Sequence, residues 1–329
     1  MNRSRLPFLA LSLAFALSCP ELSCPLARGA IVHTSTPDGN YIAYGNSFDS
    51  MLWGERYNAA GALRSRFSGV LVTPNWVITS AHALEELSSG GSVRFGTGSH
   101  FTNDRGFNQA SSTYYQHPTF DISTFLGYDL GLVYFPTPFP VLPAEFYRGP
   151  LVAGDYSVVG FGRTGPPGVP PLPNGFIRGG INVVEADLID IPSLPEMFGY
   201  RFVDATHPNF RELGSLIQAG DSGGGWFFDD GNGLKLAGIS SSGLPNDAGR
   251  MDDYGSISLA AKLDLRWIDS FLDPAAVPEP SSLALLALAG GTVWLKRRRG
   301  PRRPCVTGTS STGPGDVTEP SDSGPVVAA

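Results

Sequence analysis

One serine in the sequence lies in a setting that could make it reactive. Ser222 stands in the stretch AGDSGGGWFF, residues 219–228, where four glycines lie close to it and Asp221 precedes it. Glycine weakens helices and strands, so this density of glycine indicates a backbone shaped around the hydroxyl group. A serine hydroxyl is a poor nucleophile at neutral pH unless a base lies beside it. Ser222 is therefore a candidate nucleophile that needs a histidine.

The order of residues along the chain limits which histidine can serve. All five histidines precede Ser222: His33, His82, His100, His117 and His207. This order excludes the Gly-x-Ser-x-Gly elbow of α/β-hydrolases, in which the histidine follows the serine. The order histidine, aspartate, serine remains, as in the chymotrypsin-like arrangement.

Two apolar runs supply the other members of such an arrangement. His82 lies at the end of NWVITSAHAL, and Asp129 begins the run YDLGLVYF. Asp121 is a second candidate aspartate, but its stretch FDISTF does not continue as an apolar strand. Taken alone, a histidine at a strand end or an aspartate at a strand start is more often structural. Their joint occurrence, in order with Ser222, favours catalysis.

The elements that must position these residues read as strands. Short apolar or alternating runs separated by Gly, Pro, Asn and Asp recur through the middle of the chain, which is typical of β-structure. Residues 162–175 are rich in proline and predict a surface loop, and residues 136–150 predict a bridge between two halves. Helical periodicity first appears at residues 259–272. The pattern predicts β-barrels or a sandwich with one final helix.

Residues 31–272 resemble the trypsin-like serine proteases. The resemblance lies in TSAHAL, DLGLV and GDSGGG, and is supported by VVGFGRT and LAGISSSG. Ala83 and Ser242 depart from the animal relatives, which have cysteine and tryptophan there; the first departure fits a disulfide-free bacterial version, and the second opens the substrate cleft. The family implies an all-β fold of two packed six-stranded antiparallel β-barrels with a C-terminal α-helix. We expect the first barrel in residues 31–147, and the second, with the helix, in residues 148–273.

The same resemblance implies roles for individual residues. Ser222 would attack the substrate carbonyl, His82 would act as its base, and Asp129 would orient the imidazole. The N–H groups of Gly220 and Ser222 would form the oxyanion hole. The implied function is a serine endopeptidase that acts on protein or peptide through an acyl-enzyme. The alternative is a non-catalytic relative that binds peptide or matrix in the same cleft.

Matched positions also predict a substrate pocket. Leu216, six residues before Ser222, corresponds to the pocket floor, while Gly243 and Gly255 correspond to its walls. An apolar floor would leave a buried substrate cation without a partner, which is costly. We therefore expect cleavage after apolar residues such as Leu, Met or Phe.

An activation ion pair is a further expectation from the family. A new amino terminus at Ile31 would pair with Asp221, so we expect the mature protein to begin at Ile31. The alternative is that Ile31 and Val32 form the first strand and that other donors satisfy Asp221. Small residues at positions 27 and 29 suit a signal peptidase cut before Ala30, which would leave this residue to be trimmed.

The two ends of the chain predict export. Residues 1–30 have a charged start and a short apolar run, which is typical of a signal peptide. Residues 277–299 resemble the PEP-CTERM sorting signal of Gram-negative bacteria, which implies exosortase processing and release or attachment at the cell envelope. We expect residues 274–299 to form a Pro-Glu-Pro linker, a short transmembrane segment and a basic end. Residues 300–329, rich in Gly, Pro, Ser and Thr, predict a disordered tail.

Charge and cysteine content exclude several kinds of partner. Residues 31–273 carry 25 Asp and Glu against 14 Lys and Arg, a net charge of −11, which does not favour nucleic acid. The three cysteines, Cys19, Cys24 and Cys305, all lie outside this range. The exported domain is therefore expected to have no disulfide and no thiolate metal site, and we expect no cofactor.

Overall fold

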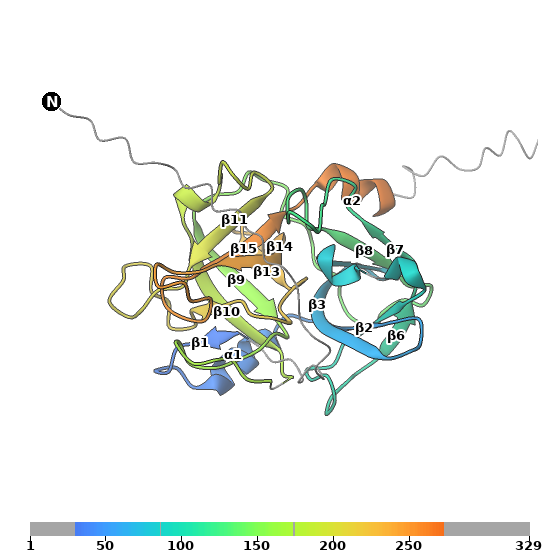
Figure 1. The fold of residues 1–329 in the computed structure, drawn as a ribbon, viewed down its shortest axis with the longest axis horizontal. Coiled ribbons are helices and arrows are strands. Elements are labelled where there is room, and N and C mark those ends of the chain that lie inside the picture. Colours follow the sequence, from blue (N-terminus) through green and yellow to red (C-terminus); the bar gives the residue numbers. More distant parts are fainter. Residues whose placement is uncertain (1–29, 86, 174, 273–329) are drawn as a thin grey trace, which may run out of the picture. The chain divides into compact units, whose positions relative to one another are not determined.

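The computed structural model describes residues 30–85, 87–173 and 175–272. Most of the predicted signal peptide, the predicted linker and transmembrane segment at 274–299, and the predicted tail at 300–329 lie outside these residues. The described chain is built mainly from strands, which form two halves side by side (Figure 1). The first half contains β2 (Met51–Tyr57), β3 (Leu63–Thr73), β4 (Trp76–Thr79), β5 (Ser92–Gly96), β6 (Asn108–Ser111), β7 (Tyr114–Gln116) and β8 (Gly131–Tyr134).

The second half is a closed antiparallel barrel. Its strands follow the order β10-β11-β15-β14-β13-β9 and close through the pairing of β9 with β10. They are β9 (Gly154–Gly160), β10 (Arg178–Val184), β11 (Met197–Arg201), β13 (Gly225–Asp229), β14 (Leu234–Leu244) and β15 (Ile257–Lys262). Trp226 fills this barrel, with its side chain fully buried and its indole N–H donating to Ser240 Oγ at 2.9 Å.

The sheet of the first half has seven strands, in the order β6-β5-β2-β3-β4-β8-β7. Its two edge strands are neighbours in sequence, because β6 ends at Ser111 and β7 begins at Tyr114. One bent segment therefore pairs with β5 at one edge and with β8 at the other. Ser111 Oγ also donates to the backbone carbonyl of Tyr134 in β8 at 2.6 Å. The first half thus has seven strands where six were expected, because a bend separates β6 from β7.

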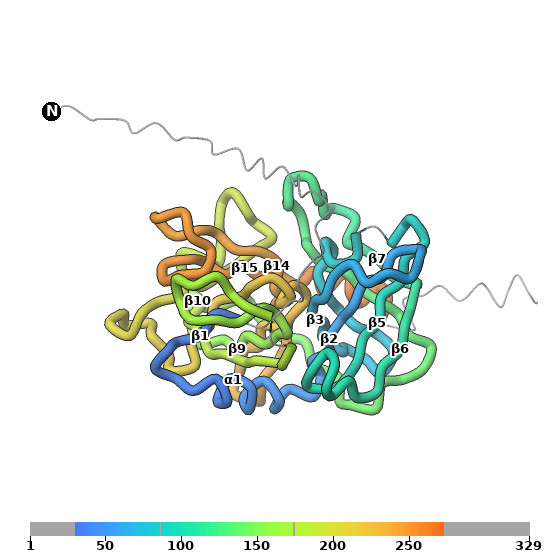
Figure 2. Tube along the Cα trace, turned by 60° about the horizontal axis from the view of Figure 1, so that its bottom comes forward, coloured from blue at the N-terminus to red at the C-terminus, as the bar shows by residue number. Residues whose placement is uncertain are grey.

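The two ends of the described chain cross over to the opposite halves. Short β1 (Ile31–Val32) pairs with β12 (Ser215–Leu216), and α1 (Asp38–Gly45) lies against β10 of the second half (Figure 2). The side chain of Arg178 is buried and binds both carboxylate oxygens of Asp38 at 2.7 and 2.6 Å. At the other end, α2 (Leu265–Leu272) lies against the first half, where Phe271 contacts Trp76 and Tyr115.

The final helix is shorter than the sequence pattern predicts. Residues 257–262 form strand β15, which is hydrogen-bonded between β11 and β14, so the predicted helix at 259–272 is wrong over its first part. Asp264 ends the strand region and caps the helix, since its Oδ1 accepts the N–H groups of Arg266 and Trp267 at 3.1 and 3.2 Å. A fully buried strand shows no alternation and resembles a helix segment in sequence.

The largest apolar cluster lies between the halves. It joins Val70 and Leu132 of the first half to Val159 and Ile239 of the second. Separate clusters fill the interior of each half. The predicted all-β, two-barrel fold with a C-terminal helix is therefore confirmed. Three short 3-10 helices complete the described elements: η1 (His82–Leu84), η2 (Leu87–Ser89) and η3 (Ala186–Leu188).

Candidate active site

The first half brings His82 and Asp129 together through neighbouring strands. β4 ends at Thr79, and the chain turns into η1, which begins with His82. β8 pairs with β4, and Asp129 lies just before it. His82 Nδ1 lies 2.7 Å from Asp129 Oδ2, and the backbone N–H of His82 donates to Oδ1 at 2.9 Å. Both carboxylate oxygens thus hold the same histidine, which fixes the position of its ring.

The second half supplies the third group. Ser222 lies in the turn between β12 and β13, and its Oγ is 2.8 Å from His82 Nε2. The carboxylate, imidazole and hydroxyl therefore form one continuous hydrogen-bonded series across the interface between the halves. The other candidate aspartate, Asp121, lies in an exposed turn, where its carboxylate accepts hydrogen bonds from Ser123 and Thr124.

The carboxyl group of Asp129 stays ionised although it is fully buried. Burial by itself disfavours the charge, but the interaction with His82 and hydrogen bonds from His82 and Ser241 outweigh it and lower the pKa of Asp129. Ser241 Oγ donates to Asp129 Oδ2 at 2.6 Å. Sequence reasoning missed Ser241 as part of the site. Its signal in the sequence is the stretch LAGISSSG, in which the resemblance identifies a supporting strand and no site residue.

The backbone near Ser222 leaves two N–H groups available. The N–H groups of Asp221, Gly223 and Gly224 donate to carbonyl groups of the chain. Within the part of the chain that the structure describes, the N–H groups of Gly220 and Ser222 have no hydrogen-bond acceptor. Gly220 has a φ of +101°, a conformation that favours glycine, and a Cβ there would lie 2.9 Å from Gly162 Cα.

The peptide that carries the Gly220 N–H is held from its other side. Ala219 O accepts a hydrogen bond from the Arg163 N–H at 2.9 Å. Because a trans peptide is planar, its C=O and N–H point in opposite directions. The Gly220 N–H is therefore directed away from Arg163. A carbonyl oxygen bound next to Ser222 could accept hydrogen bonds from these two free N–H groups.

Asp221 has neutral partners in this chain. The carboxylate is 4% exposed and accepts the N–H groups of Gly162 and Gln218 at 2.7 and 2.8 Å. Burial raises its pKa to about 6. Ile31, which follows Ala30 here, is fully buried and pairs with Leu216. In the chain that retains Ala30, these backbone donors satisfy the carboxylate, and the ion pair predicted for a chain that begins at Ile31 stays a prediction.

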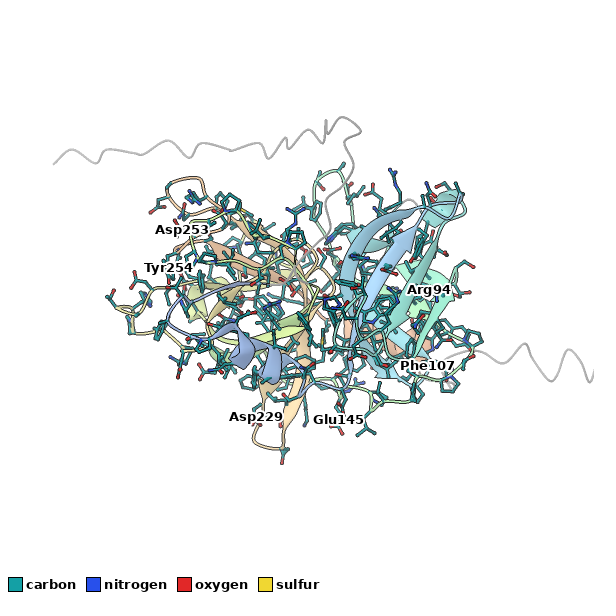
Figure 3. The ribbon with its side chains drawn as sticks, turned by 90° about the horizontal axis from the view of Figure 1, so that it is seen from below. Arg94, Phe107, Glu145, Asp229, Asp253 and Tyr254 are labelled. Atoms are coloured by element: carbon teal, nitrogen blue, oxygen red, sulfur yellow. The ribbon has the colours of Figure 1, made fainter. Side chains whose placement is uncertain are left out.

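A cavity of about 170 Å³ lies beside Ser222. Leu216 and Gly243 are among the residues that line it, although only 2% of Leu216 is exposed because Ile31 and Phe202 cover it. The other lining residues are Ile217, Gln218, Ala219, Ser241, Ser242, Met251 and Ile257, none of them charged. The loop with Asp253 and Tyr254 that follows Met251 lies in the second half, far from Arg94 (Figure 3).

Gly255, the second predicted wall residue, does not line this cavity. Its N–H donates to Phe202 O at 2.7 Å, and a Cβ there would meet Asn246. Gly255 therefore packs inside its own loop, residues 245–256, and Ile257 lines the cavity. Phe125 is a second residue that sequence reasoning missed. It has a φ of +55°, and its ring lies against His82 with centroids 5.3 Å apart.

Comparison with known proteins identifies the family. The family model described as trypsin matches residues 50–264. The chain belongs to the trypsin family. This makes it a trypsin-like serine protease, a hydrolase, and the match contains all three residues of the hydrogen-bonded series. A solved structure titled "HL collagenase" has the same fold as this trypsin-family chain, with a TM-score of 0.52 and 18% identity. The likeness covers 69% of this chain and 94% of that one.

A second family model matches the end of the chain. The model described as the PEP-CTERM protein-sorting motif covers residues 276–299, which lie outside the described structure. The motif indicates export to the cell envelope or secretion in a Gram-negative bacterium. No curated protein matches this trypsin-family chain. Among the residues that the structure describes, no helix is long and apolar enough to cross a membrane. The same residues contain no group of acidic, histidine or cysteine side chains that could hold a metal ion.

Proposed function

We propose that the protein is an exported endopeptidase in which Ser222, His82 and Asp129 act as the catalytic triad. The observation that carries this proposal is the series of short contacts, 2.7 Å from Asp129 to His82 and 2.8 Å from His82 to Ser222. These lie within the range needed for proton transfer between nucleophile and base.

The proposed reaction proceeds in two stages through an acyl-enzyme. Ser222 Oγ attacks the peptide carbonyl while its proton moves to His82 Nε2, and the imidazolium then gives that proton to the leaving amine. Water next attacks the ester formed on Ser222, with His82 again accepting and returning the proton. Asp129 receives the Nδ1–H hydrogen bond throughout and stabilises the imidazolium. The N–H groups of Gly220 and Ser222 stabilise the oxyanion of each tetrahedral intermediate.

The cavity beside Ser222 supports a preference for apolar side chains before the scissile bond. Its lining has no charged group to pair with a substrate cation or anion. A cavity of about 150 Å³ with apolar walls is large enough for a benzene ring, and the cavity here has a similar size. We therefore propose cleavage after Leu, Met or Phe.

The export signals support a place of action outside the cytoplasm. We propose that an exosortase processes the motif at residues 276–299 and that this segment attaches the protein to the membrane until it is processed. The proposed substrates are then proteins or peptides at the cell envelope or beyond it.

A labelled fluorophosphonate tests the triad directly. The purified domain should react with the probe and hydrolyse peptide substrates. Ser222→Ala should abolish labelling, and His82→Ala should reduce turnover by a factor on the order of 10⁴. The matched control is Ser270→Ala, because Ser270 lies in α2 and its hydroxyl bonds only within that helix. Labelling or peptide hydrolysis retained by Ser222→Ala would refute the proposal.

A further inference from the structure

One buried hydroxyl of the first half holds the glycine of the proposed oxyanion hole. Ser68 lies in β3 and is fully buried. Its Oγ donates to Gly220 O at 2.8 Å and accepts the N–H of Phe161 at 2.9 Å. Gly220 and Phe161 belong to the second half, so this single hydroxyl joins β3 to two separate segments across the interface.

The backbone of Ser68 adds two further links. Its N–H donates to Ser222 O at 2.8 Å, and its own carbonyl accepts from Thr79 Oγ1 at 2.7 Å. Ser68 therefore binds the carbonyl groups of both residues whose N–H groups would receive the oxyanion. Thr79 fixes Ser68 in turn and lies at the end of β4, three residues before His82.

The hydroxyl matters because glycine cannot hold a conformation by itself. Glycine populates positive and negative φ about equally, so the φ of +101° at Gly220 has to be imposed by contacts. The two peptides that meet at Gly220 are both held. Arg163 N–H binds the carbonyl before it, at Ala219, and Ser68 Oγ binds the carbonyl after it. Together they determine the direction of the Gly220 N–H.

We propose that Ser68 is a positioning residue for catalysis, which fixes the Gly220 N–H before substrate binds. The inference rests on the proposed function of the site. Electrostatic stabilisation of a tetrahedral intermediate depends on donors that are already oriented, so losing this orientation weakens transition-state binding more than substrate binding. Ser68 touches neither the substrate nor the reacting atoms.

The Ser68→Ala variant tests this role, with Ser80→Ala as the matched control. Ser80 is also fully buried in the first half, and its Oγ has no hydrogen-bond partner in the described structure. The Ser68 variant should lower kcat about tenfold and leave KM within about twofold, since one net hydrogen bond changes a rate by roughly that factor. A peptide aldehyde, which forms an oxyanion adduct with the serine, should bind more weakly by the same factor. Ser68→Cys, which keeps a weak donor, should recover part of the loss.

The outcomes separate the inference from the proposed function. If the wild type hydrolyses peptide and Ser68→Ala keeps its kcat and aldehyde affinity, Ser68 has no positioning role. If the wild type itself is inactive, the proposed function fails. The crystal structure of Ser68→Ala then decides the inference without an activity measurement. If Gly220 keeps a φ near +101° in that structure and is as well ordered as in the wild type, the inference is overturned. A reoriented or disordered Gly220 peptide supports the inference.

Discussion

The buried carboxyl group of Asp221 should make the stability of the domain depend on how the amino terminus is processed. Asp221 and the strand of Ile31 and Val32 both contact residues 162–165: Asp221 accepts the N–H of Gly162, and Val32 N–H donates to Gly165 O. Two forms of the domain should therefore differ, one that keeps Ala30 and one that begins at Ile31. In the second form, the α-amine becomes a cation available to Asp221.

The size of the effect follows from the pKa of Asp221. Burial raises this pKa from its ordinary 3.8 to about 6 in the chain that keeps Ala30, so the folded state binds the proton more tightly than the unfolded state. The contribution of Asp221 to stability is then greatest below about pH 4 and decreases as the pH rises through 6. Two pH units of difference correspond to about 3 kcal/mol of unfolding free energy.

Pairing with the α-amine should reverse this behaviour. A cation beside Asp221 lowers the pKa of its carboxyl group, so the domain no longer loses stability between about pH 4 and 7. The α-amine has an ordinary pKa of about 8, which the pairing raises. The stability that it contributes is present below about pH 8 and is lost as the pH rises through the raised value.

Denaturant unfolding of both forms between about pH 4 and 9 measures these changes. Each form is compared with its own Asp221→Asn variant, so that the other carboxyl groups cancel. The form with Ala30 should lose about 3 kcal/mol relative to its variant between about pH 4 and 7. A constant difference across this range would refute the reasoning about burial. A chain that begins at Ile31 and still shows the loss would refute the ion pair.

Three further changes test other parts of the structure. Gly243→Val should raise KM about tenfold for substrates with Phe before the scissile bond and leave KM unchanged for those with Ala. The reason is that a Cβ at Gly243 lies 2.9 Å from Ile257 O, in the lining of the cavity; kinetics with the two paired substrates measure this. Ser241→Ala should reduce kcat about tenfold, because it removes a hydrogen bond that holds Asp129 ionised and in place. Loss of this bond should raise the pKa of Asp129 and shift the pH–rate profile to higher pH, and an unchanged profile would contradict this role. Deleting residues 277–329 should release the domain from the cell envelope, and fractionation that finds it still membrane-bound would exclude the segment as an anchor.

The sequence was sufficient to predict that three particular residues meet, because each of them lies in a local pattern. His82 lies at the end of one apolar run, Asp129 at the start of another and Ser222 in a glycine-rich stretch, and their order leaves one arrangement. Ser68 gave no such signal, since a serine inside the strand RFSGVLVT looks like any buried small residue and its partners are backbone atoms. Nor did anything in the sequence indicate that Ile257, two residues after Gly255, lines the cavity.

Contacts between distant segments were also invisible in the sequence. Nothing in the periodicity of residues 31–45 or 265–272 indicates which half of the molecule each will meet. Burial of Arg178 against Asp38, for example, depends on a pairing of residues 140 positions apart. The helical pattern predicted at 259–272 overlaps the end of the strand at 257–262, because a central strand, buried on both faces, lacks alternation.

The crossed ends of the chain make the two barrels interdependent. α1 contacts the second half and α2 contacts the first, so a cut between residues 147 and 148 would leave each half without the segment that covers it. The described residues of both halves accordingly belong to one compact unit. We expect a single cooperative unfolding transition, in which loosening α2 exposes apolar surface in the half that carries His82. The sorting motif begins at residue 276, four residues along the chain after α2 ends, so α2 is the described element nearest to the motif in sequence.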